Sequence, residues 1–127
     1  MYSKEVLEHF QKPRNVGKIE CADGFGEERG GPNCPEDIAH FWIRVQDGRI
    51  VEVKQKTRGC PVAIASSSMT STLAEGKTLE EAAQITAQAV IQALGGVTER
   101  KLDSIVGPRA LQSAIAECKT KLAKHGA

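Results

Sequence analysis

The sequence carries almost no net charge and no apolar run long enough to span a bilayer. Its formal charge is +1 at pH 7, which gives no electrostatic argument for nucleic acid or an anionic membrane as a partner. The first residues lack the basic and then apolar plan of a signal peptide. We therefore expect a cytoplasmic protein that binds neither nucleic acid nor membrane.

Common cofactor motifs are missing as well. The chain has no Walker-type phosphate loop, no dinucleotide-binding glycine pattern and no Gly-X-Ser-X-Gly nucleophile elbow. It also has no internal repeat, low-complexity tract or linker, and 127 residues fit one domain, residues 1–127, that can bury a core without disulfides. Conventional cofactor enzymology therefore has no support, and a single domain is expected.

Turn and capping signals divide the chain into strands followed by helices. Asp47-Gly48 predicts a hairpin between strands over 38–45 and 50–57. The glycine-rich segment 24–32 predicts an exposed strand or loop outside the core. Helices are predicted after Ser3, over 61–74, from Thr78 with a break near 84–86, and from Pro108. This order predicts an α+β fold, with an antiparallel sheet covered on one side by helices.

Cys60 has the strongest local argument for chemistry. It stands between the end of the second predicted strand and Pro61, which suits the first position of a helix. A thiol there lies beside unpaired backbone N–H groups that favour negative charge. The alternative is a small buried side chain at a strand–helix junction. Ser66, Ser67 and Ser68 follow on the same helix and point in different directions, so only some of them can face a site.

The other cysteines have weaker arguments. Cys34 precedes Pro35, Glu36 and Asp37 in a turn where a thiolate and carboxylates can bind one metal, although such turns are often plain solvated loop. Cys118 falls on the apolar stripe of the last predicted helix, and Cys21 has no recognisable partner. An unexported chain of this size has no need of disulfides.

Five segments of the chain resemble, in the same order, the NifU/IscU-type iron-sulfur scaffold family. They are 10–17, 31–34, 59–68, 76–82 and 110–119. The resemblance implies a three-stranded antiparallel sheet with helices on one side. It also implies a domain that accepts persulfide sulfur from a cysteine desulfurase, assembles a [2Fe-2S] cluster with iron, and passes it to apo iron-sulfur proteins.

The resemblance also implies a ligand set. Cys34 matches the first family cysteine and Cys60 the second, which makes Cys60 the persulfide acceptor with Cys34 as its partner. Asp37 matches the family aspartate, but it stands three places after the cysteine where the family has two, so Glu36 is a rival. Asp103 stands in the segment where the family has His-Cys-Ser, and it is the side chain left there to coordinate.

The missing third cysteine leaves Cys34, Asp37, Cys60 and Asp103 as two soft and two hard donors. Such a set suits a labile [2Fe-2S] cluster or Fe²⁺, and also Zn²⁺ in the isolated protein. A homodimer that offers four thiolates to one bridging cluster is an open alternative. The family's Leu-Pro-Pro-Val-Lys stretch is replaced by residues 97–101, so recognition by the specialised Hsp70 chaperone is not expected.

Three functions remain open at this point. The first is a divergent iron-sulfur scaffold, a carrier rather than an enzyme. The second is a zinc-bound sulfur-relay protein in which Cys60 accepts a persulfide by thiol exchange, a sulfurtransferase-like role. The third is a regulator that keeps the desulfurase-binding surface without building clusters.

Overall fold

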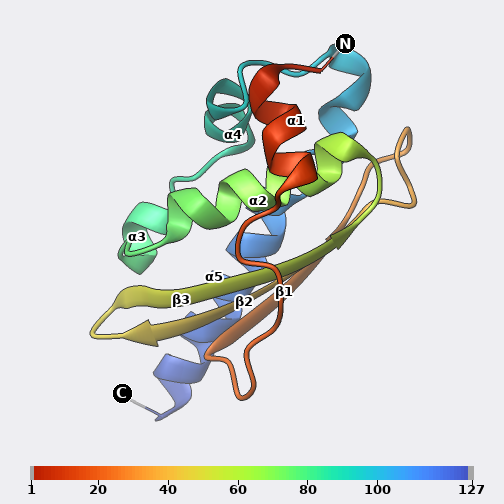
Figure 1. Cartoon of the computed structure of the whole chain (residues 1–127). Helices are drawn as coiled ribbons and strands as arrows, with labels where there is room; N and C mark the ends of the chain where they lie inside the picture. Colours follow the sequence, from red (N-terminus) through yellow and green to blue (C-terminus); the bar gives the residue numbers. More distant parts are fainter. Residues whose placement is uncertain (1, 126–127) are drawn as a thin grey trace.

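The structure, a computed structural model, describes residues 2–125, which form one helix, three strands and then further helices (Figure 1). The strands are β1 (Gly24–Arg29), β2 (Ile38–Gln46) and β3 (Arg49–Arg58). The helices are α1 (Lys4–Gln11), α2 (Pro61–Ala74), α3 (Leu79–Ala82), α4 (Ala87–Ala93) and α5 (Gly107–His125), with a 3₁₀ helix, η1 (Glu99–Ser104), before α5. Among the described residues, we find no helix with the length and apolar character needed to cross a membrane.

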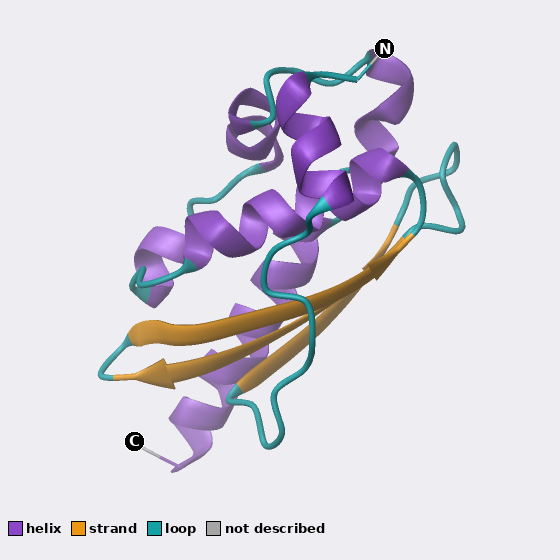
Figure 2. Cartoon of the chain, in the orientation of Figure 1, coloured by secondary structure: helices purple, strands orange, loops and turns teal. Residues whose placement is uncertain are grey.

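The three strands form one antiparallel sheet in the order β1-β2-β3 (Figure 2). The side chains of Phe41 and Ile43 in β2 are fully buried on the face that α2 and α5 cover. Trp42 and its cross-strand partner Lys54 alternate to the other face. The predicted α+β fold, with helices on one side of the sheet, is therefore confirmed.

Strand β1 packs more closely on α5 than its sequence predicts. Gly24 and Gly26 are paired with Ile43 and Phe41, so they lie on the helix-facing side of the sheet. A Cβ atom on Gly26 would lie 2.2 Å from the carbonyl oxygen of Ala110. The expectation that segment 24–32 stays outside the core is therefore wrong for these two glycines, because they let the strand backbone touch the helix backbone.

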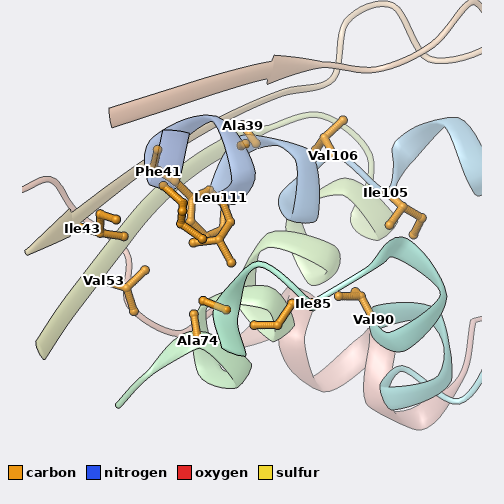
Figure 3. Packing of buried hydrophobic residues seen from close by; sticks show 14 of the residues in the cluster. Ala39, Phe41, Ile43, Val53, Ala74, Ile85, Val90, Ile105, Val106 and Leu111 are labelled. Atoms are coloured by element: carbon orange, nitrogen blue, oxygen red, sulfur yellow. The ribbon is translucent and has the colours of Figure 1, made fainter. Parts of the chain in front are cut away.

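Buried apolar side chains from the sheet and from five helices meet in one core (Figure 3). Helices α1 and α4 pack against α2 on its side away from the sheet, as Figure 1 shows. Fully buried members of this core are Phe41, Ile43, Ile50, Val62, Val90, Leu94 and Leu111. At about 1.5–3 kcal/mol for each buried aliphatic or aromatic side chain, this core is the main source of stability.

Most predicted element boundaries are confirmed. Asp47 and Gly48 adopt positive φ angles of 52° and 76° in the hairpin, and Thr78 with Glu81 forms a capping box at α3. Thr86 then caps α4, so the predicted break separates two short helices. Leu122, near the end of α5, is 51% exposed, so the apolar stripe that carries Cys118 ends before this residue.

Candidate metal centre

Three segments that are distant in sequence meet at one end of the sheet. Cys60 is the N-cap residue of α2, directly after β3. Cys34 lies in the loop between β1 and β2, which Figure 1 shows beside the end of β3 and the start of α2. Ser104 ends η1. The strand end, the loop and the 3₁₀ helix thus bring their side chains to one place.

The Ser104 hydroxyl joins the two thiols. Its Oγ atom lies 2.9 Å from Cys34 Sγ and 3.2 Å from Cys60 Sγ. In this arrangement the hydroxyl donates to Cys34 and accepts from the thiol of Cys60. The two sulfur atoms are therefore neighbours, separated by no more than the sum of these two distances.

Helix α2 fixes the position of Ser104 through small side chains. Ser66 Oγ lies 3.4 Å from the Ser104 carbonyl oxygen, and it accepts the backbone N–H of Gly107 at 3.4 Å. A Cβ atom on Gly107 would lie 2.9 Å from Ser67 Cα. Because α2 carries serines here and no larger side chains, the segment from η1 to α5 packs directly on the helix and holds the Ser104 hydroxyl against the thiols.

Asp37 places a buried carboxylate beside Cys60. Only 4% of Asp37 is exposed, and its Oδ1 atom accepts the backbone N–H of Cys60 at 3.0 Å. The other oxygen, Oδ2, lies 3.7 Å from Cys60 Sγ. The carboxylate therefore accepts one of the backbone N–H groups that have no partner within α2.

Asp103 makes its hydrogen bonds to the β1–β2 loop and not to the thiols. Its Oδ2 atom accepts the backbone N–H of Asn33 at 3.0 Å, and its carbonyl oxygen accepts the N–H of Gly31 at 3.2 Å. A Cβ atom on Gly31 would lie 2.6 Å from the Asp103 carboxyl carbon. Asp103 also lines a separate small cavity, of about 120 Å³, beside Gly31. Its carboxylate thus fastens the loop that carries Cys34.

A cavity of about 470 Å³ opens in front of the thiols. Cys34, Cys60, Asp37 and Glu36 line it together with the ammonium-bearing Lys101. Glu36 is exposed, whereas Asp37 is buried and bonded to α2. Among the side chains of residues 2–124, no three of His, Cys, Asp or Glu approach closely enough to hold a metal ion, so any metal needs a donor of another type or a movement of the loop.

The remaining candidate residues lie away from this cavity. Burial raises the pKa of the Cys118 thiol, which packs in the core as predicted. Cys21 is exposed. His40 pairs with Glu27 on the sheet, and His9 is buried in a hydrogen bond to Ser68. The structure therefore gives both histidines local contacts apart from the thiols.

Sequence reasoning missed two residues of the site. In the sequence, Ser104 only ends the segment that stands where the family has His-Cys-Ser. Lys101 only ends the segment 97–101 that stands where the family has Leu-Pro-Pro-Val-Lys. Since serine and lysine are common on any surface, no sequence signal separates these two from the other serines and lysines. Only the packing of η1 against α2 and the β1–β2 loop assigns them to the thiols.

The described residues form a three-stranded α+β domain with two neighbouring thiols at one end of its sheet. The chain belongs to the family of the NifU-like N terminal domain, whose model matches residues 1–125.

The chain is similar to curated relatives in sequence and to a solved structure in fold. The chain is 50% identical over 118 residues to the iron-sulfur cluster assembly scaffold protein IscU 1 of Archaeoglobus fulgidus, covering 92% of this chain and 76% of the relative. It is 39% identical over 124 residues to IscU of Haemophilus influenzae, covering 94% and 97%. A NifU-like N-terminal structure from Brucella abortus superimposes with a TM-score of 0.78 at 17% identity, covering 93% and 94%, which supports the fold.

Proposed function

We propose that this protein is an iron-sulfur cluster assembly scaffold that accepts sulfur from a cysteine desulfurase, combines it with iron, and passes a labile [2Fe-2S] cluster to apo-proteins. The observation that carries this proposal is the meeting of Cys34 and Cys60 on one cavity, with the Asp37 carboxylate beside them. Two relatives of similar length bear the name of cluster assembly scaffold proteins, which supports the same role.

The chemistry follows from the placement of each side chain. Cys60 stands at the helix N-terminus and faces the cavity, so it is the acceptor for a persulfide sulfur. In that exchange the Cys60 thiolate attacks the outer persulfide sulfur, and the donor cysteine leaves as a thiolate. A thiol reductant, such as excess free cysteine, then supplies the two electrons that convert each transferred sulfur into sulfide. Cys34 and Asp37 then hold iron with Cys60. The fourth donor comes from the Asp103–Ser104 segment, where the family has its third cysteine.

Anaerobic reconstitution tests this proposal. The reduced protein is incubated with ferrous iron, cysteine and a cysteine desulfurase, and the product is followed by visible absorption and by iron and zinc analysis. We expect sulfur-to-iron charge-transfer bands in the wild type and in Cys21→Ala, whose thiol is exposed and outside the site. The same bands are expected to vanish in Cys60→Ala.

Other outcomes of this experiment point elsewhere. Stoichiometric zinc without a chromophore, together with a persulfide on Cys60, would instead identify a sulfur relay. A protein that takes up neither metal nor persulfide sulfur would overturn the scaffold and the relay together and leave the regulator.

A further inference from the structure

The site has two thiols where an iron-sulfur cluster is ordinarily held by four Cys thiolates, so the identity of the next protein donor decides how a metal is held. Two neighbouring residues compete for that position, Asp103 and Ser104. Asp103 carries the better ligand by charge, because a carboxylate binds Fe²⁺ and Zn²⁺ more strongly than a neutral hydroxyl. Its contacts, however, are made away from the sulfurs.

The Asp103 carboxylate already contacts the β1–β2 loop, which carries Cys34. Its Oδ2 atom accepts the Asn33 N–H at 3.0 Å, and its carboxyl group packs on Gly31. The cavity that it lines is the small one beside Gly31, not the one in front of the thiols. Turning this carboxylate towards Cys60 would break its exposed hydrogen bond to the Asn33 N–H, at a net cost of roughly 1 kcal/mol.

Ser104 lines neither cavity, but it contacts both sulfurs directly. Its side chain is fully buried, and its Oγ atom lies within hydrogen-bonding distance of both sulfurs. When a metal binds, both thiols lose their protons to solvent as the metal–sulfur bonds form. The Ser104 oxygen then no longer accepts a hydrogen bond from the Cys60 thiol, so its lone pair is available to a metal bound between the two sulfurs.

The distances fit a tetrahedral ligand set. In a site with metal–sulfur bonds of about 2.3 Å and metal–oxygen bonds of about 2.0 Å, a sulfur and an oxygen ligand lie roughly 3.5 Å apart. Ser104 Oγ is 2.9 Å from Cys34 Sγ and 3.2 Å from Cys60 Sγ, and Asp37 Oδ2 is 3.7 Å from Cys60 Sγ. These three sulfur–oxygen distances therefore lie within about 0.6 Å of the tetrahedral value.

From this geometry we propose that Ser104, and not Asp103, is the third protein donor to a metal bound by Cys34 and Cys60, with Asp37 as the fourth. This assignment rests on the proposed function, because it concerns the same thiols. Asp103 is a positioning residue that fixes the loop of Cys34.

The test uses Co²⁺ alone, added to the reduced protein without iron, sulfide or desulfurase. Sulfur-to-cobalt charge-transfer absorption reports how many thiolates bind, and competition with a chelator reports affinity. We expect Ser104→Ala to weaken Co²⁺ binding by at least roughly tenfold, since losing even a hydrogen-bond partner of a ligand costs about 10- to 100-fold. Asp103→Asn keeps the hydrogen bond to Asn33 in part and should bind Co²⁺ as the wild type does.

A matched pair of cysteine variants separates ligation from a merely structural role. Ser104→Cys should add the absorption of a third thiolate, whereas Asp103→Cys should add none. Circular dichroism and thermal melting of each variant check that it folds. The assignment is overturned by a Ser104→Cys spectrum with two thiolates, by a third thiolate in Asp103→Cys, or by wild-type protein that binds no Co²⁺.

The reconstitution experiment stays separate from this one. A cluster that forms normally while Ser104→Cys gains no thiolate would remove the ligand assignment and leave the scaffold function. A third thiolate in Ser104→Cys, combined with failure to build any cluster, would remove the scaffold function and leave the ligand assignment.

Discussion

At the scale of single residues, Gly59 controls how closely Asp37 approaches the start of α2. Its φ angle is +141°, and a Cβ atom there would lie 2.1 Å from Asp37 Oδ1. We expect Gly59→Ala to destabilise the fold by about 1–3 kcal/mol, because it adds both backbone strain and a clash with a buried carboxylate. Urea unfolding followed by circular dichroism measures this loss.

Gly76→Ala is the matched control for that prediction. Gly76 also has a positive φ angle, +75°, but a Cβ atom there would meet nothing within 4 Å. It therefore reports the backbone strain alone, of about 1 kcal/mol. Equal losses in the two variants would show that the contact between Gly59 and Asp37 has no special cost.

Some residues of the candidate site could be predicted from the sequence, and others could not. The position of Cys60 before Pro61 at a helix start was predictable from local capping chemistry, and the structure places it there. The choice of Asp37 over Glu36 stayed open, because only tertiary packing buries one carboxylate and exposes the other. Ser104 was not predictable, since its hydroxyl becomes notable only when two distant thiols reach it.

At the scale of secondary-structure elements, α1 is fastened to α2 by a buried polar contact. His9 Nδ1 lies 2.7 Å from Ser68 Oγ, which also accepts the Arg14 N–H at 2.9 Å. Burial is the main cause that lowers the pKa of His9 below 6.5, and the charge of Arg14 lowers it further against the opposing effect of Glu8. The native state therefore holds a neutral imidazole between the two helices.

This contact predicts a pH dependence of stability with a definite sign. The folded-state pKa of His9 is the lower one, so the unfolded chain binds the proton more readily. Full stability is expected above pH 6.5, with a loss that grows as the pH falls through the ordinary histidine range and levels off only below the folded-state pKa. Chemical denaturation at a series of pH values between 5 and 8 measures it.

His9→Gln should remove this part of the pH dependence, whereas His40→Gln should keep it. His40 lies on the sheet and pairs with Glu27, away from the contact between α1 and α2. A wild-type pH profile in His9→Gln would show that other groups set the acid sensitivity of the fold.

Local sequence signals predict the hairpin, the capping box and the start of α2, but they do not predict the burial of β1. The hairpin, the capping box and the Pro61 helix follow from turn and cap chemistry, and each is present. Strand β1 carries glycines where a buried strand ordinarily has apolar side chains. Its burial depends on the close approach of α5, a contact between segments some 90 residues apart, so no local pattern indicates it.

At the scale of the whole molecule, the candidate site ties together the loop after β1, the start of α2 and the end of η1. These segments contribute Cys34 with Asp37, Cys60, and Ser104. The unfolded chain cannot present these donors together, so a metal held by them would bind the native state in preference to the unfolded one. Such binding would link metal affinity to global stability.

This linkage predicts the size of a thermal shift. A metal at about 100 times its dissociation constant adds about 2.7 kcal/mol of stability, which for a domain of this size raises Tm by on the order of 10 °C. Calorimetry of reduced protein with and without Zn²⁺ should show this rise in the wild type and in Cys21→Ala. Cys34→Ala removes one thiolate and should lose most of it. A rise of equal size in Cys34→Ala would mean that Zn²⁺ stabilises the protein from somewhere other than the cavity between the three segments.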